Sequence, residues 1–107
     1  MEKLIITTGN EIPGKQIAEI LGLVRGNTVR ARNIGRDIGA SLKSIVGGEI
    51  KTYSEMTTAA RDEAFNRMVN QAIALKANAI VGIRFGTSMV MQNASEMLAF
   101  GTAVKLK

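Results

Sequence analysis

The sequence contains no cysteine, no histidine and no tryptophan among its 107 residues. Without cysteine, a disulfide framework and a thiolate nucleophile are both excluded. Without cysteine and histidine together, the usual zinc ligand sets and any serine–histidine triad are excluded as well. These absences remove most of the side-chain chemistry on which small metalloproteins and hydrolases depend.

Aromatic residues are also scarce, at 4% of the chain. The core must therefore be built from Ile, Val, Leu, Met and Ala. A domain of this length buries only about two thirds of the surface that its unfolded chain exposes. A core that is thin in this way is commonly completed by packing against other copies of the same chain. We therefore expect self-association.

Long hydrophobic runs are missing too. The first apolar run, Leu4–Thr8, is too short for a signal peptide, and no run reaches the roughly 18 residues of a membrane span. We expect a single cytoplasmic domain over residues 1–107 with no membrane partner. The net charge of +5 attracts anions without specifying one, and charges of both signs are interspersed along the chain.

Alternating or short apolar runs bounded by turn residues predict the strands of the fold. Gly26-Asn27 is expected to form a bulge or tight turn between two of them. The predicted strands are Leu4–Thr8, Gln16–Val24, Thr28–Arg32, Ala79–Phe85, Met89–Gln92 and Met97–Leu106.

Helical spacing follows the third predicted strand. Asn33 is a suitable N-cap, and Gly47-Gly48 is expected to end the helix. Two glycines four residues apart, Gly35 and Gly39, suggest that another backbone approaches this helix closely. The apolar face of the helix is predicted to consist of Ile34, Ile38, Leu42 and Ile45.

A second, longer helix is predicted from an N-cap at Ser54 to about Lys76. Its buried stripe is expected to contain Met56, Ala60, Ala64, Met68 and Ala72, widened by Phe65, Val69, Ile73 and Leu75. The element order is then strand, strand, helix, helix, strand, strand. This order predicts an α+β subunit of two layers, with the helices on one face of an antiparallel or mixed sheet.

Short motifs along nearly the whole chain, from about Ile5 to Val104, resemble the YbjQ-like family of small proteins. Each motif is brief, but their order and spacing together are specific. The motifs are Gly22-Leu23-Val24, Asn33-Ile34, Arg36-Asp37-Ile38, Ile45-Val46-Gly47-Gly48, Tyr53, Ala60-Arg61 with Ala64, Ala77-Asn78-Ala79 with Gly82, and Gly101-Thr102-Ala103-Val104.

The resemblance implies a small α+β subunit that closes into a ring, expected to be a homopentamer. It carries a heavy-metal-binding label and no established enzymatic activity. Lys76 departs from the family pattern, since a glycine usually ends the long helix there, and Lys76 or Asn78 must then adopt a left-handed conformation. The family-like residues expected to have structural roles are Asp37, Gly47, Gly48, Tyr53, Arg61, Asn78, Gly82, Gly101 and Thr102.

A metal site would have to use soft methionine sulfurs, because no cysteine or histidine is available. Met89 and Met91 are predicted to share a strand face, and Met97 is expected to return alongside them. Three thioethers are a ligand set for Cu(I). The alternative is that these residues fill an irregular core or a subunit interface, and we favour that role.

Arginines around the third strand form the second candidate site. Arg30 and Arg32 project from the same strand face, and Arg36 follows in the first turn of the next helix, with Arg25 nearby. Guanidinium groups beside a helix N-terminus bind phosphate or carboxylate groups. The alternative is that Arg36 forms a structural ion pair with an acidic group while the others are solvated. A small anion is thus a candidate partner, and no cofactor is expected.

Enzyme and nucleic-acid functions have little support. The chain has no pair of carboxylates at catalytic spacing and no phosphate-binding glycine loop, and Tyr53 is better explained as a packed side chain. None of the four aromatic residues lies in the arginine cluster, so base stacking is not indicated. We expect a homo-oligomeric structural or ligand-binding protein rather than an enzyme. The alternative is a protein that binds a small anion or a metal ion at a subunit interface.

Overall fold

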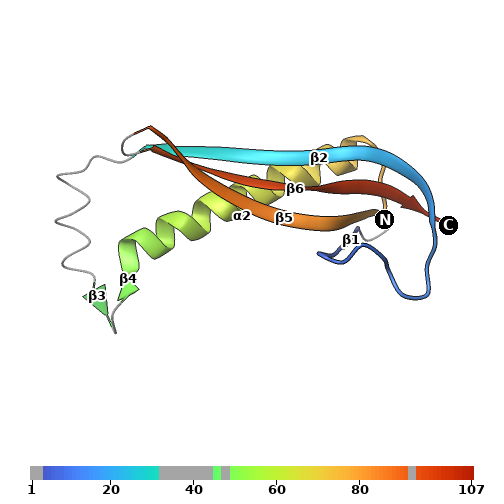
Figure 1. The fold of residues 1–107 in the computed structure, drawn as a ribbon, viewed down its shortest axis with the longest axis horizontal. Coiled ribbons are helices and arrows are strands. Elements are labelled where there is room, and N and C mark those ends of the chain that lie inside the picture. The colour runs from blue at the N-terminus through green and yellow to red at the C-terminus, as the bar shows by residue number, and fades with distance from the viewer. Residues whose placement is uncertain (1–3, 32–44, 47–48, 92–93) are drawn as a thin grey trace.

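The computed structural model describes residues 4–31, 45–46, 49–91 and 94–107, with side chains over 4–29, 57–91 and 94–107. Figure 1 shows long strands lying across one long helix. The elements in chain order are β1 (Ile5–Ile6), β2 (Ile17–Ala31), β3 (Ile45–Val46), β4 (Glu49–Ile50), α2 (Lys51–Ala74), β5 (Ala79–Met91) and β6 (Ala94–Leu106).

The main sheet has four strands in the order β1-β5-β6-β2. The short β1 runs parallel to β5, whereas β6 is antiparallel to both β5 and β2. The sheet is therefore mixed and open, and α2 packs across one of its faces (Figure 1). The predicted α+β class with a mixed sheet is confirmed.

The first predicted helix falls mainly on residues outside the described part of the chain, as do its Gly35/Gly39 pair and the Gly47-Gly48 break. One end of this prediction was wrong. Ile45 belongs to β3, where it lies opposite Ile50 of β4, and Val46 lies opposite Glu49. Two consecutive β-branched residues favour a strand over the last turn of a helix.

Strand β2 runs without interruption through Gly26-Asn27, so the turn predicted there was wrong. Gly26 is needed for a different reason. A Cβ atom at this position would lie 2.2 Å from the carbonyl oxygen of Ala64 and 2.5 Å from the backbone nitrogen of Met68. Only a residue without a side chain lets α2 cross the strand at this distance.

The irregularities of the sheet lie elsewhere. In β2 the register against β6 shifts near Gly22, whose φ is +132°. In β5 it shifts between Val81 and Arg84, around Gly82 with φ +64°. Both glycines adopt a conformation that other residues rarely take. Strand β5 nevertheless continues from Ala79 to Met91, where two separate strands were predicted.

Helix α2 begins at Lys51, so Ser54 lies inside it and does not cap it. Its C-terminus is closed by Lys76, which has φ +64°. The Lys76 amide donates to Ile73 O at 2.9 Å and the Ala77 amide donates to Ala72 O at 3.1 Å, the two bonds of a Schellman motif. The expectation that Lys76 or Asn78 would take the left-handed position is confirmed, and the residue is Lys76.

The main core lies between α2 and the sheet. Of the predicted stripe, Ala60, Ala64, Met68 and Ala72 are buried, with Phe65 and Val69 at the margin, and the Met56 side chain is outside the described residues. Ile73 and Leu75 were predicted to widen the stripe and are instead exposed. Three of the four stripe residues are alanine, which allows the helix backbone to lie close to the sheet.

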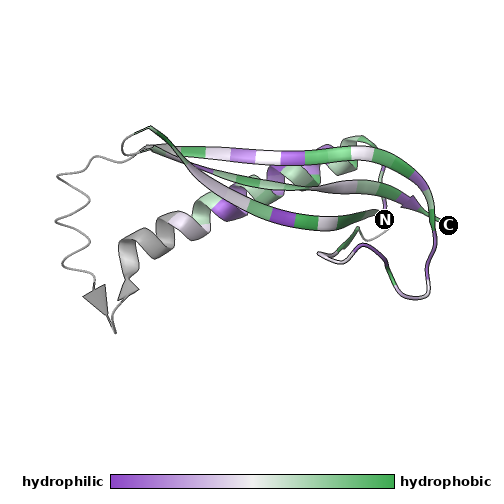
Figure 2. Cartoon of the chain, in the orientation of Figure 1, coloured by the Kyte–Doolittle hydropathy of each residue, from purple (hydrophilic) through white to green (hydrophobic). Residues whose placement is uncertain are grey.

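A second, smaller core lies on the opposite face of the sheet. Ala79, Val81 and Val104 are buried there beneath Ile5 and Ile12 of the N-terminal segment. That segment follows β5 with hydrogen bonds from Thr7 N to Ile80 O and from Gly82 N to Gly9 O. It covers only one end of this face. Figure 2 shows hydrophobic segments in green along β2, β5 and β6 well beyond the covered end.

Candidate functional site

The predicted anion site lies mostly beyond what the structure describes. Arg32 and Arg36 are outside the described residues. Arg30 is in strand β2, but its side chain is outside them too. The arginine site with a helix N-terminus therefore stays a prediction.

Arg25 is the member of that cluster whose side chain is described. Its neighbours in β2, Val24 and Gly26, are buried under α2, so Arg25 projects from the opposite face of the sheet and is exposed. The register places Arg25 opposite Phe100 of β6, and Phe100 opposite Arg84 of β5. An aromatic ring thus lies between two arginines on the face opposite α2, close to the middle of the sheet.

The two arginines differ in how they are held. Arg84 donates from Nη1 to Thr8 O and to Ile83 O, each at 2.8 Å. The Arg25 guanidinium makes no hydrogen bond to any described residue, although the Arg25 backbone amide donates to Gln71 Oε1 at 2.9 Å. No pattern in the sequence predicts this row, because the register at Arg84 depends on the bulge around Gly82.

The three methionines proposed as soft ligands occupy different surroundings. Met97 packs against the main core, whereas Met89 and Met91 are 76% and 65% exposed. Met97 lies opposite Thr87, while Met89 lies opposite Ser95 and Met91 opposite Ala94. The register shift between Met89 and Met91 breaks the simple alternation that would put them on one face.

Other donors offer no better metal site. Within the described ranges, no three His, Cys, Asp or Glu side chains come close enough to hold a metal ion. Two of the described carboxylates have partners: Glu63 forms an ion pair with Arg67, and Glu96 accepts from Asn27 Nδ2 at 3.2 Å. Soft heavy-metal ions prefer thiolate and imidazole ligands, which this chain lacks entirely. These residues do not fit a heavy-metal site.

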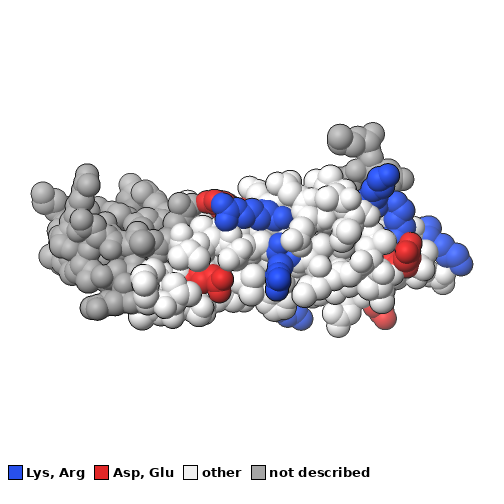
Figure 3. Space-filling view, turned by 90° about the horizontal axis from the view of Figure 1, so that it is seen from above, with Lys and Arg blue, Asp and Glu red and all other residues white. Residues whose placement is uncertain are grey.

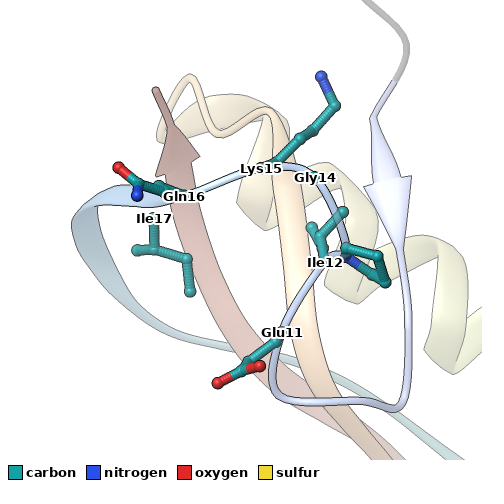
Figure 4. Close-up of a pocket in the computed structure, with 7 residues that line it drawn as sticks. Glu11, Ile12, Gly14, Lys15, Gln16 and Ile17 are labelled. Atoms are coloured by element: carbon teal, nitrogen blue, oxygen red, sulfur yellow. The ribbon is translucent and has the colours of Figure 1, made fainter.

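A hollow of about 470 Å³ lies against the N-terminal loop (Figure 4). It is lined by Glu11, Ile12, Pro13, Gly14, Lys15, Gln16 and Ile17. All seven residues are consecutive, so the hollow is the concave side of one turn, closed by the bond from Lys15 N to Ile12 O. Figure 4 shows the Lys15 side chain pointing away from the loop. Among the residues that the structure describes, none from another element contributes a polar group to it.

Several family-like residues hold the sheet and helix together. Asn78 Oδ1 accepts from Leu106 N at 2.7 Å, and Asn78 O accepts from Ile5 N at 3.1 Å, which links the connection between α2 and β5 to β6 and β1. Gly82 forms the bulge of β5. Gly101 is buried, and a Cβ there would lie 2.9 Å from Ile80 Cγ2.

The remaining family-like residues are less informative. Thr102 lies opposite Val81 and Leu23 in the sheet, and Arg61 is exposed on α2. Tyr53 is in α2 with its side chain outside the described residues, and Asp37, Gly47 and Gly48 are outside them altogether.

Charged side chains of both signs are interspersed on the face that Figure 3 shows. Figure 3 shows basic side chains next to acidic ones in the middle of one face, with further basic groups toward one end. No single basic field is visible on this face. Among the described helices, none has the length and hydropathy to cross a lipid bilayer.

Comparison with known proteins gives consistent relatives. A UPF0145 protein of Methanoculleus marisnigri is 57% identical over 96% of this chain and 96% of its own length. A UPF0145 protein of Archaeoglobus fulgidus is 56% identical over 100% of both chains. A crystal structure of a protein with unknown function from Pediococcus pentosaceus, of the DUF74 family, shares the fold with a TM-score of 0.68. It is 18% identical and covers 97% of this chain and 98% of its own.

A family model described as "Putative heavy-metal-binding" matches residues 4–107. Its match includes every motif on which the YbjQ-like resemblance rests, and it agrees with the identity to the UPF0145 relatives. The chain therefore belongs to the YbjQ-like family, although its sequence contains no thiolate or imidazole ligand for the heavy metal of the family label.

Proposed function

We propose that this protein is a non-catalytic subunit of a homo-oligomer, acting as a structural or ligand-binding assembly. The observation that supports the proposal is the amount of apolar surface left open by one chain. A ring of five subunits is the arrangement expected from the family resemblance.

The exposed apolar residues are numerous for so small a protein. Among the described residues, the largest side chains that are fully buried are Met68, Ile80, Val24 and Val104. The exposed large apolar side chains are Ile6, Ile17, Ile20, Leu23, Val29, Ile73, Leu75, Phe85, Met89, Val90 and Met91.

Isolated apolar residues on a surface are ordinary, but a contiguous group marks an interaction site. Phe85, Met89, Val90 and Met91 all belong to the far half of β5, beyond the reach of the N-terminal segment. Val29 lies at the same end of the sheet but on the other face, since it pairs with Glu96, which pairs with Ser88 of β5. A second copy of the chain would bury this surface.

The mass in dilute solution tests the proposal. We expect light scattering coupled to gel filtration to give a mass several times the 11.5 kDa of one chain at micromolar concentration. Bovine serum albumin run under the same conditions calibrates the mass scale. A protein that elutes and scatters as a monomer throughout this range would rule out the assembly.

A second candidate function is the binding of a small anion, and the Arg25–Phe100–Arg84 row favours it. Arg25 has an exposed guanidinium without a described hydrogen-bond partner, and Arg84 is fixed two strands away on the same face. Arginine binds phosphate and carboxylate groups through paired N–H donors. The net charge of +5 raises the local concentration of any such ligand.

Phosphate should therefore raise the melting temperature of the parent protein, and the rise should be lost in Arg25→Ala. The physical reason is linkage, since a ligand that binds only the folded state stabilises it. Arg61→Ala, which removes an exposed arginine on α2, is the matched control and should keep the response. Zinc ions should give no comparable rise, because the chain lacks thiolate and imidazole ligands. An unchanged phosphate response in Arg25→Ala would place the anion elsewhere.

A further inference from the structure

The two outer edges of the sheet differ in how their backbone groups are used. On the β2 edge, α2 supplies hydrogen-bond partners. Gln71 Oε1 accepts from Arg25 N at 2.9 Å, and Arg67 Nη1 donates to Asn27 O at 2.6 Å. The Arg67 side chain is held in place by its ion pair with Glu63. The middle of the β2 edge is therefore occupied by the helix of the same chain.

These bonds also fix the phase of the hydrogen-bond ladder. Residues of an antiparallel strand point their N–H and C=O groups alternately toward one neighbour and then the other. The backbone N–H and C=O groups of Arg25 and Asn27 point away from β6. The backbone groups of the alternate β2 residues must therefore point toward β6, where Val24, Gly26 and Thr28 pair with Gly101, Ala99 and Met97. The alternate β6 residues Phe100, Leu98 and Glu96 then pair with Arg84, Gly86 and Ser88 of β5.

It follows that Phe85, Thr87 and Met89 direct their backbone N–H and C=O groups away from β6, toward the outer edge of β5. The N-terminal segment covers this edge only as far as Ile83, whose amide donates to Thr7 O at 3.3 Å. Beyond Ile83, β5 pairs with β6 on one side, and no strand in the described part of the chain pairs with its outer side. The unpaired backbone groups form a ready template for another strand.

The side chains along this edge suit strand addition. Residues 85–91 read Phe-Gly-Thr-Ser-Met-Val-Met, with no charge and no proline. Natural proteins usually protect an open edge with lysine, proline or a covering segment. Residues 85–91 contain neither lysine nor proline, and no strand in the described part of the chain pairs with their outer side. Phe85, Met89, Val90 and Met91 are exposed at 45%, 76%, 52% and 65%, and neighbouring strand residues project to opposite faces.

We propose that the outer edge of β5 from Phe85 to Met91, the β5 edge, is an interface that adds a strand from a second copy of this chain. This inference rests on the proposed homo-oligomer and names the surface that builds it. A partner strand would satisfy the outward N–H and C=O groups and cover apolar side chains on both faces. A surface that only packs against one face would leave the backbone groups of the edge unpaired.

Thr87→Pro is the direct test, because proline removes the outward N–H and leaves the inward pairs of Gly86 and Ser88 with β6 intact. We expect the variant to lose assembly and to scatter as an 11.5 kDa chain at concentrations where the parent is oligomeric. Thr87→Val keeps the N–H at the same position and should assemble like the parent. Far-ultraviolet circular dichroism checks that each variant is folded.

Met89→Lys provides a second test that does not alter the backbone. Its side chain is 76% exposed, so the subunit should tolerate the change, while a charge on the edge opposes strand addition. We expect the same loss of mass. If both variants keep the mass of the parent, the β5 edge is not the interface, although the oligomer stands. If the parent itself is monomeric, the proposed function and this interface both fail.

Discussion

Replacing Gly26 with alanine is expected to lower the free energy of unfolding by about 3 kcal/mol, the upper end of the usual cost of overpacking. The added Cβ would lie 2.2 Å from Ala64 O, 2.5 Å from Met68 N and 2.6 Å from Arg67 Cβ. Two of these atoms belong to the helix backbone, so no change of a side-chain rotamer relieves the clash. Helix α2 would have to move away from β2, which loosens the core along its whole length.

Gly86→Ala is the matched control, since it makes the same change in a strand of the same sheet. A Cβ at Gly86 meets no heavy atom within 4 Å, and its φ is not positive. We expect no loss of stability there, and a small gain from the reduced freedom of the unfolded chain. Urea denaturation at one fixed protein concentration measures both variants. Equal midpoints for Gly26→Ala and Gly86→Ala would mean that α2 does not cross β2 this closely.

The class of fold and the buried face of α2 could both be predicted from the sequence. Ala60, Ala64, Met68 and Ala72 recur every four residues, and this period alone assigns them to one side of a helix. The left-handed end of the helix could also be anticipated, because a chain without glycine there must put Lys76 or Asn78 in that conformation. The observed residue is Lys76.

Features that depend on contacts between distant segments could not be anticipated. Gly26-Asn27 has the composition of a turn, yet the strand continues because α2, nearly forty residues later, packs on Gly26. Ile73 and Leu75 have the spacing of core residues but are exposed, because they project away from the sheet while the adjacent Ala72 is buried against it. In both cases tertiary packing decides what local pattern leaves open.

The candidate site was the least predictable part of the molecule. Arg25 and Phe100 are 75 positions apart in the sequence, and the row that they form with Arg84 depends on two strand registers and a bulge. The open β5 edge could not be predicted either. Composition does not indicate which of the two sheet edges will form hydrogen bonds with helix side chains and which will stay open. Hydrogen bonds from Gln71 and Arg67 to β2 decide that question, and they come from a helix whose sequence alone predicts only its buried stripe.

Met68→Ala is expected to reduce the free energy of unfolding by about 2–5 kcal/mol, the range for removing a large aliphatic side chain from a packed core. Met68 is fully buried and belongs to the cluster that contains Val24, Ala99 and Ala103. Its neighbours along the stripe, Ala64 and Ala72, are too small to fill the space. The cavity therefore stays open, and the loss is a large part of the 5–15 kcal/mol or so that stabilises a typical domain.

Met68→Leu distinguishes packing from any special property of the thioether. Leucine has nearly the same volume, and such exchanges usually cost less than about 1.5 kcal/mol. Calorimetric melting at equal protein concentration should place Met68→Leu near the parent and Met68→Ala far below it. If the two variants fall together, the sulfur atom itself matters and the side chain is more than core filling. If neither variant shifts the melting temperature, Met68 does not carry the packing between α2 and the sheet.

Because α2 also holds the β2 edge through Gln71 and Arg67, a loosened helix should expose that edge as well. Faster hydrogen exchange at Arg25 N in Met68→Ala than in Met68→Leu would report that coupling.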